Sequence, residues 1–144
     1  MKLEEIQTMW ERDSRIDRTE LGEESLRIPQ LHSKYFSLFS SERTRLKSLE
    51  GEYKKFFKAK FEYYTGTMSE EELKDREWEP FQLRVLKSDI NIFIDGDKDL
   101  IKVQQTIDIQ REKVDLLESI IKNLPARGFQ IKAAIDWEKF KVGA

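Results

Sequence analysis

The chain has 144 residues, of which 38% are charged, and its formal net charge is −2. This length suits one domain with a real core, and the high charge content with few glycines and prolines is typical of a helical, well-solvated protein. Cysteine is absent, which excludes disulfide scaffolds, thiolate metal sites and cysteine nucleophiles. No run approaches the roughly 18 apolar residues of a membrane span, and the acidic amphipathic start is unlike a signal peptide, so we expect the protein to stay where it is made.

Apolar periodicity predicts an all-α fold from the first residues onward. Residues 2–12 form a predicted short helix with Leu3, Ile6 and Trp10 on one side. A long helix is expected to begin near Pro29 and to run to about Thr65, where Gly66 gives a C-terminal stop. Such a helix spans about 55 Å, too long to lie within a compact globule of this size.

The long predicted helix carries a concentrated positive charge. Between Arg43 and Lys60 there are seven Lys or Arg residues and two Glu, a local net charge of 7 − 2 = +5. Four of these cations fall within an arc of roughly 60° on a helix, apart from the apolar arc. Aromatic rings interleave with the lysines at the end of the stretch, and that mixture can bind phosphates and bases together. The candidate nucleic-acid-binding residues are Arg43, Lys47, Lys54, Lys55, Lys58, Lys60, Phe61 and Tyr63.

Two charged residues of this helix, Glu42 and Lys60, project from its apolar side. They are about 27 Å apart on a straight helix, so they cannot pair with each other within it. Because a buried unpaired charge is costly, we expect Lys60 to reach water, a partner chain or a ligand.

The second half of the chain is expected to begin with a connection over residues 67–79, followed by a helix that restarts at Pro80 and breaks near Gly96. A heptad series then predicts a packing seam, and a second apolar stripe about 120° around the helix contains Ile109. Two apolar sides imply two neighbours, one of which is expected to be another subunit. Pro125 is expected to end this helix before a turn and a last helix over 129–140. The candidate oligomerisation residues are Leu100, Val103, Ile107, Val114, Leu117, Ile121, Leu124, Phe129 and Ile131.

Catalytic and metal-binding patterns are weak. His32 is the only histidine, and an ordinary, partly buried histidine is the favoured interpretation. Asp95, Asp97 and Asp99 resemble the start of a calcium loop, but position six would be Leu100 and position twelve Thr106. We therefore predict no catalytic residue, no metal site and no cofactor, and we interpret these acids as a helix N-terminus.

Several segments, in the same order through nearly the whole chain, resemble the UvsY family of recombination mediator proteins of T-even-like bacteriophages. Each segment alone is weak, but the ordered set is specific. The segments are Met1–Gln7, Ile16–Leu21, Ser33–Tyr35, Lys58–Gly66, Asp97–Val103 and Arg127–Lys132.

This resemblance implies long helices that form an extended helical hairpin or bundle and assemble into a ring-type homo-oligomer in the cytoplasm of the infected bacterial host. It implies binding of single-stranded DNA, loading of a RecA-like phage recombinase onto strands covered by the phage single-strand-binding protein, and no catalytic activity. DNA contacts are implied at Lys58 and Lys60, the second of which is typically arginine in the family. We expect residues 1–96 to form the DNA-binding region and residues 97–144 the oligomerisation region.

A helical oligomeric scaffold or adaptor without DNA binding is the alternative. In that case the heptad helix forms a bundle and the basic face is only solvated. Salt-sensitive binding of single strands distinguishes the two functions.

Overall fold

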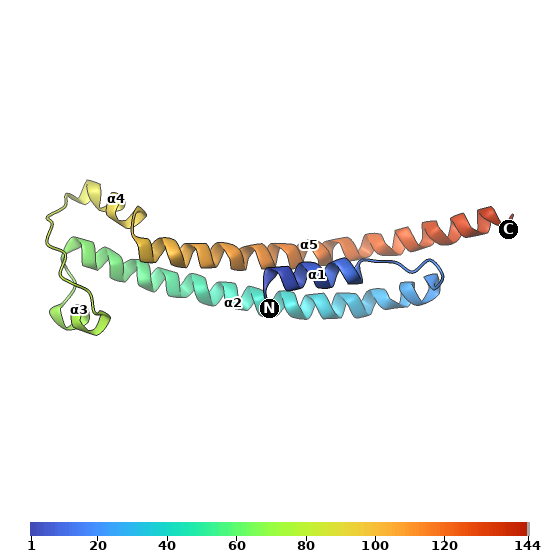
Figure 1. The fold of residues 1–144 in the computed structure, drawn as a ribbon, viewed down its shortest axis with the longest axis horizontal. Helices are drawn as coiled ribbons and strands as arrows, with labels where there is room; N and C mark the ends of the chain where they lie inside the picture. The colour runs from blue at the N-terminus through green and yellow to red at the C-terminus, as the bar shows by residue number, and fades with distance from the viewer. Residues whose placement is uncertain (144) are drawn as a thin grey trace. The chain divides into compact units, whose positions relative to one another are not determined.

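The computed structural model describes residues 1–143, and within this range it contains helices and no β-strand (Figure 1). The predicted all-α fold class is therefore confirmed. Ala144, the last residue of the predicted region 97–144, lies outside the described residues. The elements are α1 (Leu3–Asp13), α2 (Leu21–Thr65), α3 (Glu70–Arg76), the short 3₁₀ helix η1 (Lys87–Asp89), α4 (Ile90–Asp95) and α5 (Lys98–Lys141).

The chain forms two compact units, each with its own core. The first unit comprises Met1–Arg45 and Ile109–Ala144, and the second comprises Leu46–Asp108. Helices α2 and α5 each contribute residues to both units.

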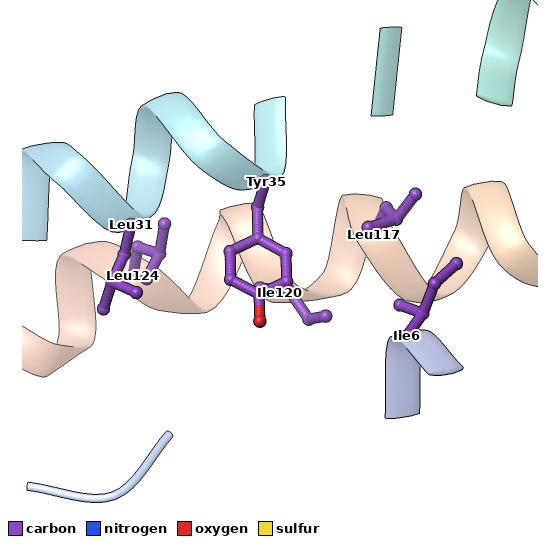
Figure 2. Packing of buried hydrophobic residues seen from close by; sticks show 6 residues of the cluster. All are labelled: Ile6, Leu31, Tyr35, Leu117, Ile120 and Leu124. Carbon is purple, nitrogen blue, oxygen red and sulfur yellow. The ribbon is translucent and has the colours of Figure 1, made fainter. Parts of the chain in front are cut away.

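Three helices build the core of the first unit. Figure 2 shows Ile6 of α1, with Leu31 and Tyr35 of α2, against the side chains of α5. The α5 residues in this cluster are Leu117, Ile120 and Leu124. Helices α1 and α2 thus cover the part of α5 around Leu117, Ile120 and Leu124 within the chain, whereas Ile109 of the second stripe is 57% exposed, so assembly through α5 stays a prediction.

Buried polar contacts hold the end of α1 and the following loop against this core. Arg127 of α5 donates to the carbonyl oxygens of Ser14 and Arg15 at 2.9 and 2.8 Å, and to the Glu24 carboxylate at 2.7 Å. Asp13 is buried and accepts hydrogen bonds from Arg27, Lys34 and Tyr35. The buried charges of Asp13, Glu24 and Arg127 are thus paired, as their desolvation requires.

The two predicted proline boundaries are wrong. Helix α2 begins at Leu21 and continues through Pro29, and α5 continues through Pro125 to Lys141. Each proline removes one intrahelical hydrogen bond. Both prolines are exposed, so the carbonyl that each one leaves without a helical donor can bond to water, while the opposite face packs on the core.

The connection between the long helices contains more structure than expected at its start and less after Pro80. Gly66 ends α2 with a φ of 75°, a left-handed conformation that favours glycine. The predicted connection contains α3, which Ser69 caps through the Glu72 N–H. Pro80 does not restart a helix, and residues 80–86 are irregular.

The second unit is built around aromatic rings and the start of α5. Its buried cluster consists of Ile90, Ile94 and Leu100, which pack against partly buried aromatic residues of α2. Phe81 lies 5.0 Å from Tyr64 and 5.5 Å from Phe93, measured between ring centroids. These ring contacts hold the irregular segment after Pro80 against α2 and α4.

Candidate nucleic-acid interface

In the second unit, one face of α2 carries several exposed lysines. Lys47, Lys54 and Lys58 lie within about 40° of one another at 100° per residue, and all three are exposed, as is Lys55. The Lys58 side chain is 79% exposed, and its Nζ lies 4.0 Å from the Glu62 carboxylate. Exposed pairs at this spacing contribute little stability, about 0.3 to 0.5 kcal/mol, so this lysine remains available to an anion.

Phe61 lies beside these lysines instead of in the core. Its angular position is within roughly 60° of Lys58 on the helix, and the residue is 44% exposed. An aromatic ring next to ammonium groups suits a strand whose phosphates and bases alternate.

Arg43 belongs to the first unit. It is exposed, and its guanidinium carbon lies 5.0 Å from the centre of the Phe39 ring. This stacking leaves the charge accessible and holds the side chain along α2.

Lys60 is buried, unlike the other candidate cations. It is 5% exposed, and its Nζ lies 2.9 Å from the Asp99 carboxylate and 3.1 Å from that of Asp97. The expectation that this lysine needs water, a partner chain or a ligand is wrong, because two carboxylates at the start of α5 in the same unit balance its charge.

Three aromatic rings surround the Lys60 ammonium group. Its Nζ lies 4.2 Å from the centre of the Trp78 ring, 5.6 Å from that of Phe56 and 5.8 Å from that of Tyr63. Cation–π contacts of this kind are strongest where water is excluded. The cluster therefore fixes Trp78, from the connection after α3, against α2.

The carboxylate of Asp97 connects Lys60 to the rest of the cluster. It accepts hydrogen bonds from the Tyr64 hydroxyl and from the Leu100 N–H, which it caps at 2.9 Å. Burial acts to raise the pKa of Asp97, but the hydrogen bonds from Tyr64, Leu100 and Lys60 and the ammonium charge together hold it below its usual value. Burial and the bond to Asp97 raise the pKa of Tyr64.

Tyr63 is half-buried among other rings. Its hydroxyl donates to the Glu79 carbonyl at 2.6 Å, and its ring lies edge-on to Trp78 at 5.4 Å. The structure thus brings the exposed lysines of α2 and Phe61 together on one side, and it brings Lys60 and Tyr63 into the aromatic cluster on another.

Most of the candidate oligomerisation residues lie in the protomer's own cores. Those that are buried within the chain are Leu100, Ile107, Val114, Leu117, Leu124 and Ile131, whereas Val103 and Ile121 are partly buried. Phe129 is 76% exposed. Of this set, Phe129 is the side chain with most of its surface open to a second subunit.

Sequence reasoning missed the partners of Lys60 and of Phe61. Two signals for the Lys60 cluster were present: a lysine on the apolar side of α2 and a group of aspartates before α5. Joining them requires knowing that the end of α2 lies beside the start of α5. No pattern in the sequence indicates that Lys87 and Ile90 border the same hollow as Phe61.

Within residues 1–143, no group of three or more His, Cys, Asp or Glu side chains is placed to hold a metal ion. No helix in this part of the chain is both long enough and apolar enough to cross a membrane.

The structure is that of an all-helical protein with an exposed, lysine-bearing face on α2. The model of the family described as "Recombination, repair and ssDNA binding protein UvsY" matches residues 9–144, and the chain belongs to this family. The recombination protein UvsY of Enterobacteria phage T4 is 28% identical over 143 residues, which is 99% of each chain.

Solved structures agree with this assignment. A crystal structure of the bacteriophage T4 recombination mediator protein UvsY, in lattice type IV, has a TM-score of 0.85 and 26% identity over 97% of this chain and 99% of that chain. The lattice type II crystal has a TM-score of 0.84 and 28% identity over 99% and 98% of the two chains. The predicted resemblance to this family is therefore confirmed.

Proposed function

We propose that this protein is a recombination mediator that binds single-stranded DNA through the exposed lysines of α2. The observation that carries the proposal is the accessible set of Lys47, Lys54, Lys55 and Lys58 with Phe61 beside it, in a chain whose family is described by recombination, repair and single-stranded-DNA binding. In this proposal Lys58 contacts phosphate directly. Lys60, whose charge is already balanced by Asp97 and Asp99, supports the site from the interior.

Loading of a RecA-like recombinase onto strands covered by a single-strand-binding protein is the biological step that we propose for this binding. When a strand binds to several basic faces, its path changes, and its binding to the single-strand-binding protein becomes weaker. A strand exchanges between a form covered by the single-strand-binding protein and a form bound by the recombinase. The mediator shifts this equilibrium only if it stabilises the recombinase-bound form more than the covered form. No catalytic activity is part of this mechanism.

A ring-type homo-oligomer supplies the affinity that one protomer lacks. A few exposed lysines bind a strand weakly, whereas repeated copies of the site raise avidity without any new contact. In this proposal residues 1–96 bind DNA and residues 97–144 mediate assembly.

The end of α5 offers an outward apolar face for this assembly. Phe129, Trp137 and Phe140 are exposed, and the rings of the last two stack at 5.6 Å. On the helix they lie opposite the face that buries Leu124 and Ile131. Charged substitutions at Phe129 and Phe140 thus test assembly without disturbing a core, whereas a charged substitution at the fully buried Leu117 would also destabilise the protomer.

The binding test compares two double variants that each lose two positive charges. In Lys54→Ala with Lys58→Ala, the slope of log affinity against log salt should fall by about 0.7 for each lost contact to single-stranded DNA. The control is Arg18→Ala with Lys139→Ala, two exposed residues outside α2. If the two variants lose affinity and slope equally, the DNA site is not on α2. Absence of strand binding at any moderate salt would favour the adaptor instead.

A further inference from the structure

A hollow beside the end of α2 combines an aromatic wall with two cations. It has a volume of about 520 Å³ and lies between Phe61 of α2 and the η1–α4 segment, where Lys87 and Ile90 border it. This volume falls within the range of sites for small organic ligands, roughly 300 to 1,000 Å³. All of its lining residues belong to the second unit.

The two lysines flank the hollow from different elements. Lys58 comes from α2 and Lys87 from η1, and both are exposed. Two ammonium groups at the edge of an apolar hollow complement a ligand that has a flat apolar body and negative charge on both sides. A nucleotide within a single strand has this form, because a phosphate precedes and follows each base.

The remaining polar atoms of the hollow accept hydrogen bonds. Glu62, Thr65 and Thr67 border it, and the hydroxyls of Thr65 and Thr67 donate to the carbonyl oxygens of Phe61 and Glu62. A hydroxyl oxygen that already donates its proton keeps lone pairs, and these can receive the N–H groups of a base. The Glu62 charge is offset by Lys58, whose Nζ lies 4.0 Å away.

From this geometry we propose that the hollow is a base-binding pocket: one base of the bound strand stacks on Phe61, while Lys58 and Lys87 contact the phosphates on its two sides. The proposal rests on the proposed single-stranded-DNA binding and adds to it a place for a base and a phosphate contact, Lys87, that lies outside α2. The pocket makes part of the affinity depend on the bases, which phosphate contacts alone do not.

The test uses the full chain and two strands of equal length, one of ordinary deoxynucleotides and one of abasic deoxyribose phosphates. Phe61→Leu keeps an apolar side chain but removes the stacking ring. Loss of one stacked base weakens binding by roughly fivefold to 150-fold. We expect this loss with the ordinary strand, no change with the abasic strand, and an unchanged salt slope with both.

Matched controls come from neighbouring residues outside the pocket. Phe57→Leu removes another exposed ring of α2, and Lys74→Ala removes an exposed lysine of α3. Both variants should bind like the parent. Lys87→Ala should lower the salt slope by about 0.7 with either strand. Circular dichroism and native mass then verify that each variant folds and assembles.

The outcomes separate this proposal from the one on which it rests. If the parent binds both strands equally and with the same salt dependence, the protein binds DNA and the base pocket is refuted. If Phe61→Leu binds both strands as Phe57→Leu does, the base pocket is refuted; if it changes the native mass instead of strand affinity, the pocket serves a protein contact. If neither strand binds, the proposed function itself fails.

Discussion

Replacing Lys60 by alanine tests whether this lysine holds the second unit together. The substitution removes an ammonium group that lies 3.1 Å from Asp97 and 2.9 Å from Asp99, and 4.2 Å from the centre of the Trp78 ring. The side chains of Lys60 and Asp97 are 7% and 4% exposed, so the lost partner leaves a buried carboxylate without its cation. Breaking a buried pair in this way costs about 3 to 5 kcal/mol, a large part of a typical total stability of about 5 to 15 kcal/mol.

The assay is urea unfolding followed by circular dichroism and tryptophan fluorescence. The protein concentration must be the same for all variants, because assembly adds to apparent stability. Lys58→Ala is the control, since the Lys58 side chain is 79% exposed and surface substitutions usually change stability by no more than about 0.5 kcal/mol. Lys60→Arg should remain near the parent, because a guanidinium keeps the charge and its planar fork can reach both aspartates.

A double-mutant cycle identifies the partner. Asp97→Asn keeps an oxygen that can cap the Leu100 N–H, while it removes the charge that Lys60 balances. The double variant should be less destabilised than the two single losses predict, with a coupling of about 0.5 to 3 kcal/mol. Unfolding free energies that are simply additive, or a Lys60→Ala variant as stable as Lys58→Ala, would refute the reasoning.

Three further predictions concern the buried charges and the helix geometry. Hydrogen bonds and cations hold the pKa values of Asp13 and Asp97 below their usual value despite burial. The contribution of these carboxylates to the free energy of unfolding is therefore present at neutral pH and is lost as pH falls from about 5 through the folded-state pKa. The urea midpoint should decline over this pH range, and it should decline less for Asp97→Asn. Arg127→Met removes the bond to the buried Glu24 and should lower the unfolding free energy by about 3 to 5 kcal/mol, while a Lys122→Ala control changes it little. Pro125→Ala should raise the thermal midpoint, since proline costs about 3 kcal/mol more than alanine inside a helix; a lower midpoint would mean that the proline shapes a contact.

Local periodicity predicted the helices and much of their buried faces. The heptad positions Leu100, Ile107 and Leu117 are buried as the pattern indicates, because a repeating apolar side has to pack on something whatever its partner is. Gly66 ends α2 as predicted, since a left-handed residue is a local requirement. The all-α class follows from such local features.

Tertiary contacts decided the features that the sequence did not reveal. Pro29 and Pro125 remain inside helices because packing on the opposite face outweighs a local penalty. The partner of Lys60 is 37 positions away at Asp97, and no spacing rule connects residues at that separation. Likewise, an apolar stripe on α5 does not say whether α1 or another subunit covers it.

The position of Lys58 and Lys60 on α2 determines how substitutions at this site should be interpreted. Side chains two positions apart on a helix point about 200° away from each other, so when one lysine faces solvent the other faces the interior. A joint replacement by alanine therefore combines loss of an exposed phosphate contact with loss of a buried ion pair, and weaker DNA binding would have two causes. Lys58→Ala and Lys60→Arg, studied as single variants, separate them: the first should flatten the salt dependence in a stable protein, and the second should leave both properties unchanged. If Lys60→Arg flattens the salt dependence while stability holds, Lys60 contacts the strand and the interior role proposed for it is wrong.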